Sequence, residues 1–219
     1  MRVRTKLLAG TGRLSSRFFL TSSLALALAL VAQAGTDRKD DKDERSGSVP
    51  EVEISNFGKV TDNLYRGAQP RDEEYRQLAA IGVKTVVDLR NDPKGDARTL
   101  AERAGLRYIN LPLSDKDYPA ADAAQRFLEI ANNSAHWPVY IHCVGGRHRT
   151  GIMTAVYRIT QEGWDIDRAY GEMKTYDFYT RFGHGAMKKY IFDFYREFRE
   201  AQERQKTPSG QTLGDTHLQ

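Results

Sequence analysis

This chain contains almost no cysteine. Cys143 is the single cysteine among 219 residues, so one chain can form no internal disulfide and no site with several cysteine ligands for zinc. The five histidines are scattered and lack the spacing of metal ligands. We therefore expect a fold held together by its hydrophobic core, with no metal and no other cofactor.

A surplus of basic residues is also missing once the N-terminus is set aside. Residues 1–34 carry five of the 33 Lys and Arg and none of the 29 Asp and Glu, which leaves 28 basic and 29 acidic residues. The formal charge of +4 therefore resides in the leader and gives no argument for nucleic-acid binding. We expect no nucleic-acid partner.

A long apolar run occurs only near the N-terminus. Basic residues precede an apolar stretch at 18–32, and Ala32-Gln33-Ala34 has the A-x-A form of a cleavage site. The stretch is short for a bilayer span, which needs ~20 residues. The pattern predicts a signal peptide over residues 1–34 and export to the periplasm or outside. The alternative is a membrane anchor at residues 18–32, and a membrane is a partner only if this segment stays uncleaved.

The rest of the chain divides by composition. Residues 35–50 are charged and nearly free of aromatic and β-branched residues, which predicts a disordered linker. Residues 51–203 are sufficient for one well-packed domain, which we expect to be monomeric. Residues 204–219 are predicted to form a flexible tail.

Within the domain, short β-type runs alternate with helical patterns. The strands are expected at 58–60, 64–66, 85–88, 108–111 and 139–142, and the helices at 71–81, 97–104, 121–132, 151–162, 166–175 and 185–203. This alternation predicts an α/β fold, a single domain with a mostly parallel central sheet flanked by helices.

The chemistry is concentrated in residues 142–151, HCVGGRHRTG, between a predicted strand and a predicted helix. Such a loop aims backbone N–H groups and the positive end of the helix dipole at one point, where an anion can bind. A thiol at that point is expected to ionise near neutral pH, which makes Cys143 the candidate nucleophile. Arg149 can hold two phosphate oxygens at once. The competing interpretation of a lone cysteine is a small buried hydrophobe.

The remaining loop residues have separate expected roles. Gly145 and Gly146 let amides approach a ligand without a clashing Cβ. The Thr150 hydroxyl either donates to the thiolate in catalysis or caps the helix, and His142 braces the loop. His148 is equally compatible with a solvated position and with a substrate contact. The predicted phosphate-binding residues are Val144, Gly145, Gly146, Arg147, His148 and Arg149.

The spacing His-Cys-x2-Gly-x2-Arg-Thr-Gly resembles the signature loop of the protein tyrosine phosphatase superfamily, in its compact dual-specificity branch. The Arg147-His148 pair is similar to atypical dual-specificity phosphatases of plants, fungi and bacteria, and residues 63–70 and 81–90 resemble other segments of that group. The likeness runs from about residue 56 to about residue 199. It implies a cysteine-phosphatase-like fold and a metal-independent hydrolysis of phosphoesters through a phospho-cysteine.

The resemblance also implies a carboxylic acid, on a mobile loop, that protonates the leaving group. Asp115 and Asp117 lie 28 and 26 residues before Cys143, in the expected region. We favour Asp115 because an aspartate shortly before Pro119 resembles the acid loop of the family, and Asp117 is the alternative.

Other polar residues are expected to have supporting roles. Arg66 and Arg90 each follow a strand, and each is expected to form a structural ion pair or to lie at the rim rather than to bind substrate. In the resembling family, the region between the last two helices can border the active site, but we expect a solvated loop there, with Asp177, Tyr179, Arg181 and His184.

The leading hypothesis is a protein tyrosine or dual-specificity phosphatase that acts on a phosphorylated protein or a small phosphoester. Three alternatives are an inositol (pyro)phosphate phosphatase, a catalytically weak phosphate-binding module, and a sulfurtransferase of the rhodanese type. Val144 and Gly145 disfavour the inositol (pyro)phosphate phosphatase, because phosphoinositide-type loops usually carry lysine or another polar residue at these positions. The sequence Arg149-Thr150-Gly151 argues against the last.

Overall fold

The computed structural model describes residues 51–93 and 95–206. The predicted leader or anchor at 1–34, the linker at 35–50 and residues 207–219 of the tail lie outside this range, so those assignments stay predictions. Within the described ranges, none of the helices has the length and apolar character needed to cross a bilayer.

A five-stranded sheet forms the centre of the domain. Its strands are β1 (Gly58–Thr61), β2 (Leu64–Gly67), β3 (Thr85–Arg90), β4 (Arg107–Leu113) and β5 (Val139–His142). They lie in the order β1-β2-β5-β3-β4, with β1 antiparallel to β2 and the other neighbours parallel. The predicted α/β fold with a mostly parallel sheet is confirmed, and β5 occupies its middle.

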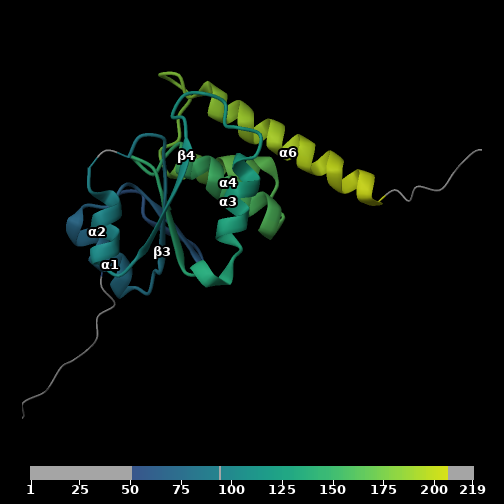
Figure 1. Ribbon diagram of the computed structural model, residues 1–219. Helices are drawn as coiled ribbons and strands as arrows, with labels where there is room; N and C mark the ends of the chain where they lie inside the picture. The colour runs from purple at the N-terminus through teal and green to yellow at the C-terminus, as the bar shows by residue number, and fades with distance from the viewer. Residues whose placement is uncertain (1–50, 94, 207–219) are drawn as a thin grey trace, which may run out of the picture. The chain divides into compact units, whose positions relative to one another are not determined.

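Helices cover both faces of this sheet. They are α1 (Asp72–Ala80), α2 (Ala97–Arg103), α3 (Ala123–Ala131), α4 (Arg149–Glu162), α5 (Ile166–Thr175) and α6 (Gly185–Lys206), with a short 3₁₀ turn at Ser134–His136. Figure 1 shows α1 and α2 on one side of the sheet and α3, α4 and α6 on the other. The sheet is therefore enclosed, as parallel sheets require.

Alternation along the strands produces two hydrophobic cores. Val86 and Tyr140 belong to the core under α1 and α2, whereas Val87 and Ile141 belong to the core under the other helices. Neighbouring strand residues point to opposite faces, so both faces of β3 and β5 are apolar. In α4, ten of the 14 residues are buried, which fixes this helix firmly after β5.

The last helix is longer than its sequence pattern predicts. α6 continues to Lys206, so it includes the first three residues of the segment expected to be a flexible tail. The end of this helix is rich in Arg, Glu, Gln and Lys, which are good helix formers. Arg204 also lies 3.8 Å from the carboxylate of Glu200, one turn earlier.

Candidate active site

Cys143 is located where β5 ends, and α4 begins six residues later at Arg149. Its side chain is only 3% exposed, at the base of a cavity of about 290 Å³. The cavity is lined by Asp115, Cys143, Val144, Gly145, Arg147, His148, Arg149, Tyr179 and His184. Five of the six predicted phosphate-binding residues are in this set, while Gly146 and Thr150 are not.

The carbonyl groups of the loop are held by residues that do not line the cavity. Three consecutive carbonyls accept hydrogen bonds, Val144 from the Gln69 amide at 3.1 Å, Gly145 from Asn56 Nδ2 at 2.8 Å and Gly146 from Arg66 Nη2 at 2.6 Å. In a trans peptide the N–H points opposite to the C=O of the same unit. The amides that follow these carbonyls are therefore turned toward the cavity, where an anion can accept from them.

The structure explains on steric grounds why one position of the loop must be glycine. Gly146 has φ of +67°, and a Cβ there would lie 2.5 Å from the carbonyl carbon of Gly67. No other residue fits that backbone and that contact. A Cβ at Gly145 would meet only the Arg147 side chain, at 3.6 Å. The protein itself therefore requires glycine at 146 but not at 145, and the predicted role of both glycines in the approach of a ligand stays a prediction.

The surroundings of Cys143 favour the thiolate. Burial opposes ionisation, but hydrogen bonds from the Thr150 side chain and amide, the charge of Arg149 and the Gly146 amide together hold the thiol pKa below its usual value. The buried Thr150 hydroxyl has no partner of ordinary hydrogen-bond geometry within the described residues, so it is available to the sulfur. Cys143 is therefore a buried thiol in a cationic, amide-lined site, which differs from the inert hydrophobe considered above.

Arg149 reaches the cavity from the first turn of α4. Its Nη1 donates to the Leu113 carbonyl at 3.3 Å and lies 3.5 Å from Asn91 Oδ1, so the ends of β4 and β3 orient the guanidinium. No other hydrogen bond of this guanidinium occurs within the described chain, which leaves the Nε and Nη2 donors for an anion.

The two candidate acids have different environments. Asp115 lines the cavity together with Cys143, whereas Asp117 does not. The Asp117 carboxylate instead accepts a hydrogen bond from Ser114 Oγ at 2.8 Å, and the Asp117 amide donates to the same oxygen at 3.1 Å. This local turn occupies Asp117, so the geometry favours Asp115 as the acid.

The segment between α5 and α6 forms one wall of the cavity. Tyr179 and His184 line it, so the expectation of a solvated loop is wrong for these two residues. The His148 ring stacks on the His184 ring with a centroid distance of 3.7 Å, and His148 Nε2 lies 3.1 Å from the Tyr179 carbonyl. Burial and the neighbouring His184 lower the pKa of His148 to about 4, so its imidazole is neutral at pH 7. His148 is thus part of the wall and not a solvated residue.

A comparison with protein families decides the identity of this site. A family described as "DSP-PTPase phosphatase fused to NAD+ Kinase" matches residues 49–189, which include the whole cysteine loop and both candidate acids. The chain belongs to this family. The resemblance inferred from the cysteine loop is therefore confirmed.

Individual relatives of this DSP-PTPase chain agree with the family. TpbA of Pseudomonas aeruginosa, named as a dual specificity protein phosphatase, is 32% identical over 119 residues, which are 54% of this chain and 53% of TpbA. SIW14 of Saccharomyces cerevisiae, named as an inositol diphosphatase, is 27% identical over 130 residues, 56% of this chain and 46% of SIW14. The chain spans about half the length of these curated relatives.

The fold of the DSP-PTPase domain is also that of TpbA. A crystal structure of TpbA matches 68% of this chain and 91% of its own chain, with a TM-score of 0.57 and 28% identity. A second TpbA structure, of a cysteine-to-serine variant, is in complex with pTyr, at 26% identity and a TM-score of 0.54 over 68% of this chain and 90% of that one.

Buried polar residues support the DSP-PTPase loop from below. His142 is fully buried, its Nδ1 lies 3.2 Å from the Cys143 carbonyl, and burial lowers its pKa to about 4. A neutral ring whose Nδ1 carries the proton can donate to that carbonyl, which agrees with the predicted bracing role. Asp88, 3.8 Å from His142 Nε2, pairs with Arg90 Nη2 at 2.6 Å. Arg90 is therefore in the structural ion pair that we expected.

Arg66 supports the loop in a way that its sequence position does not indicate. It is 1% exposed, it donates to the Gly146 carbonyl, and its guanidinium lies 3.7 Å from the centroid of the Tyr176 ring. Among the described residues no carboxylate pairs with it, so the structure shows neither the expected ion pair nor the expected rim position. Burial lowers its pKa to about 10, so the guanidinium remains charged at pH 7.

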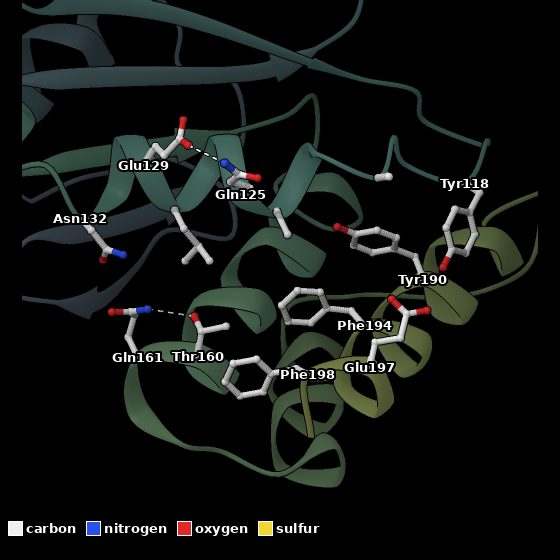
Figure 2. Close-up of a pocket in the computed structure, with 13 residues that line it drawn as sticks. Tyr118, Gln125, Glu129, Asn132, Thr160, Gln161, Tyr190, Phe194, Glu197 and Phe198 are labelled. Atoms are coloured by element: carbon white, nitrogen blue, oxygen red, sulfur yellow. Dashed lines mark hydrogen bonds between the residues drawn. The ribbon is translucent and has the colours of Figure 1, made fainter. Parts of the chain in front are cut away.

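The rest of the described domain offers no second site for this chemistry. Residues 51–93 and 95–206 contain no cluster of three His, Cys, Asp or Glu side chains placed to hold a metal ion. A wider cavity of about 820 Å³ lies among α3, α4 and α6, with apolar walls that include Leu128, Phe194 and Phe198 (Figure 2). It shares no residue with the Cys143 cavity and its lining contains no cysteine or arginine, so we place the chemistry at Cys143.

Proposed function

We propose that this chain is a cysteine-dependent, metal-independent phosphatase whose first substrate class is phosphotyrosine in proteins. One observation carries the proposal. A thiol with a lowered pKa faces a loop in which the three carbonyls of residues 144–146 are bonded outside the cavity, and Arg149 and Asp115 line the same cavity. These parts are what transfer of a dianionic phosphoryl group to sulfur requires.

In the first step, the Cys143 thiolate attacks phosphorus. The S–P bond forms while the bond from phosphorus to the ester oxygen breaks, and the carboxylic acid form of Asp115 gives its proton to the leaving oxygen. Arg149 and the loop amides donate hydrogen bonds to the three non-bridging oxygens and stabilise their negative charge. The product alcohol or phenol leaves, and Cys143 carries the phosphoryl group.

In the second step, water replaces the thiolate. The Asp115 carboxylate takes a proton from water as the water oxygen bonds to phosphorus and the S–P bond breaks. Inorganic phosphate leaves, Cys143 is again a thiolate and Asp115 is again protonated. Thr150, which donates to the sulfur, stabilises the thiolate as leaving group.

The cavity walls favour an aromatic phosphoester. Tyr179 and the stacked His148 and His184 rings form one wall, where a phenyl ring can pack. Near this wall, Phe182 is 74% exposed, with its ring 6.2 Å from that of Tyr179, and Val144 in the loop is 60% exposed. Such apolar groups suit an apolar protein segment better than a strongly hydrated polyphosphate. TpbA, a relative, has a structure with pTyr.

A second candidate is hydrolysis of inositol (pyro)phosphates. The relative SIW14 is named as an inositol diphosphatase. Arg147 supports this candidate, because its guanidinium lines the cavity and its carboxylate partner Asp177 lies 3.6 Å away on the exposed loop. A second phosphate could displace Asp177 and pair with Arg147.

The test is a panel of phosphotyrosine peptides, phosphoserine and phosphothreonine peptides and an inositol pyrophosphate, assayed in EDTA. We expect phosphotyrosine turnover with wild type, none with Cys143→Ser, and a loss of about 10²- to 10⁴-fold with Asp115→Asn. Faster turnover of the inositol pyrophosphate would favour the second candidate. Vanadate binding without turnover would indicate a phosphate-binding module, and a requirement for a divalent cation would refute the mechanism. A thiosulfate sulfurtransferase assay tests the remaining alternative.

A further inference from the structure

The loop that carries Asp115 is attached to the same part of the fold at that residue and at a second residue further along the loop. His184, directly before α6, has its Nδ1 2.8 Å from the Asp115 main-chain carbonyl, and a carbonyl can only accept, so Nδ1 carries the proton. Three residues after Asp115, the Tyr118 hydroxyl donates to Asp193 Oδ2 on α6 at 3.1 Å. The loop is thus bound to α6 and the turn that precedes it.

Asp193 is well suited to hold Tyr118. It is only 8% exposed, and besides Tyr118 it pairs with Lys189 and with Arg196, whose Nη2 lies 3.0 Å from Oδ1. These cations sit on the same helix, one turn on either side, so they fix the carboxylate in place. The Tyr118 ring meets the Tyr190 ring edge-on, with centroids 5.3 Å apart, and Figure 2 shows the two rings beside α6.

The acid loop needs such an attachment. Residues 115–118 are exposed and contain no regular helix or strand, and their turn with Ser114 is local, so it does not fix the loop relative to the rest of the domain. A general acid must reach the leaving oxygen within about 3 Å, and proton transfer falls when it spends less time there. His184 also stacks on His148, so the same turn joins the acid loop to the cradle that holds the phosphate.

We propose that α6 positions the general acid, with Tyr118, Asp193 and His184 as positioning residues for Asp115. The inference rests on the proposed function. None of the three reacts with substrate in this scheme. Tyr118 and Asp193 hold the C-terminal side of the acid loop, and His184 holds the main chain of Asp115 itself. The competing explanation is that these contacts only attach α6 to the domain.

The leaving group separates the two explanations. A phenol of high pKa needs protonation as it leaves, whereas a phenol with electron-withdrawing groups leaves as the anion and needs no acid. The experiment compares phosphotyrosine with a fluorinated aryl phosphate for Tyr118→Phe, Asp193→Asn and the reference Asp115→Asn. Tyr195→Phe is the matched control, because it removes a phenol hydroxyl from α6, and among the described residues Tyr195 forms no hydrogen bond or ring contact with the acid loop.

We expect Tyr118→Phe and Asp193→Asn to lower kcat for phosphotyrosine about tenfold, with KM and kcat for the fluorinated ester within about twofold of wild type. Asp115→Asn should show the same pattern with a larger loss. The rate at which iodoacetate alkylates Cys143 should not change in Tyr118→Phe or Asp193→Asn, since neither residue touches the thiol. Tyr195→Phe should match wild type on both substrates.

Three results would overturn the inference. Equal losses on both substrates, or slower alkylation of Cys143, would show a merely structural role. If Tyr118→Phe and Asp193→Asn behave like wild type on both substrates while Asp115→Asn loses activity on phosphotyrosine alone, positioning by α6 is refuted and the proposed function is left intact. If Asp115→Asn does not lose activity selectively on phosphotyrosine, Asp115 is not the general acid and the inference fails with it. If one variant does not fold, as judged by circular dichroism, the other decides.

Discussion

Arg66 Nη2 donates a hydrogen bond to the Gly146 carbonyl at 2.6 Å, across 80 residues of sequence. The contact is possible because β2, which contains Arg66, lies beside β5 in the sheet. Sheet order therefore determines the conformation of the cysteine loop. The neighbouring strand holds a carbonyl away from the cavity and thereby directs the following amide into it.

We expect Arg66→Met to impair activity more than stability. The variant leaves the Gly146 carbonyl without its donor, which costs about 1–3 kcal/mol, but it also removes a buried charge whose desolvation is unfavourable. The unfolding free energy in urea should change by no more than about 2 kcal/mol, while kcat/KM falls at least about tenfold as the loop loosens. Arg98→Met, on the surface of α2, serves as control. Unchanged kcat/KM in Arg66→Met would contradict the proposed support.

The two glycines at 146 and 151 should respond differently to alanine. At Gly146 a Cβ meets the Gly67 backbone at a positive φ, so Gly146→Ala should lower kcat/KM by about 100-fold or more and destabilise the fold by at least about 1 kcal/mol. At Gly151, inside α4, the nearest atom would be Met173 Cγ at 3.6 Å, which is an ordinary contact. Gly151→Ala should be neutral or stabilise by up to about 1 kcal/mol. Thermal unfolding and steady-state kinetics of both variants test this contrast.

The reactivity of Cys143 should depend on the Thr150 hydroxyl. Hydrogen bonds from Thr150 lower the thiol pKa, so Thr150→Val must raise it. The midpoint of the pH dependence of alkylation by iodoacetate should move upward by about one to two units, since a hydrogen bond to a charged group contributes about 1.5–3 kcal/mol. Thr150→Ser keeps the hydroxyl and should keep the wild-type midpoint. A midpoint that is the same in all three proteins would exclude this role.

His142 should make the domain less stable in mild acid. Burial lowers its pKa to about 4 from an ordinary 6.5, so between these values the unfolded chain binds a proton that the folded protein does not. The contribution of His142 to stability is therefore complete above pH 6.5 and declines as the pH falls toward 4, by about 2 kcal/mol at pH 5. Urea unfolding at pH 7.5 and pH 5 measures this decline. His142→Asn, whose amide can replace the Nδ1 donor, should reduce the decline by about the same amount, and an unchanged difference would count against the explanation.

The local elements of this fold could be predicted from the sequence. Every expected strand and helix is present, because the apolar periodicity of each is a property of neighbouring residues. Cys143 and Arg149 were also identifiable, since a thiol and a guanidinium six positions apart in a glycine-rich loop are a local pattern. The preference for Asp115 could have been strengthened from the sequence too, because Ser114 lies three residues before Asp117 and can close a turn with it.

Long-range contacts could not be predicted in the same way. Asn56 reaches the Gly145 carbonyl across 89 residues, and Tyr118 reaches Asp193 across 75. Both contacts depend on which elements become neighbours, which no local pattern specifies. The position of Tyr179 and His184 did leave a signal, namely an aromatic-rich loop between two helices, where exposed rings are costly unless they bind something.

The sheet order has a further consequence for how the site can vary. The nucleophile follows β5, the central strand, whereas Asp115 follows β4, which forms an edge. Amide exchange should accordingly be slowest near Cys143 and faster around the acid loop. Substitutions in the acid loop can then change how Asp115 delivers its proton without changing the position of the Cys143 sulfur. Selection could tune leaving-group preference and nucleophile reactivity almost independently in this molecule.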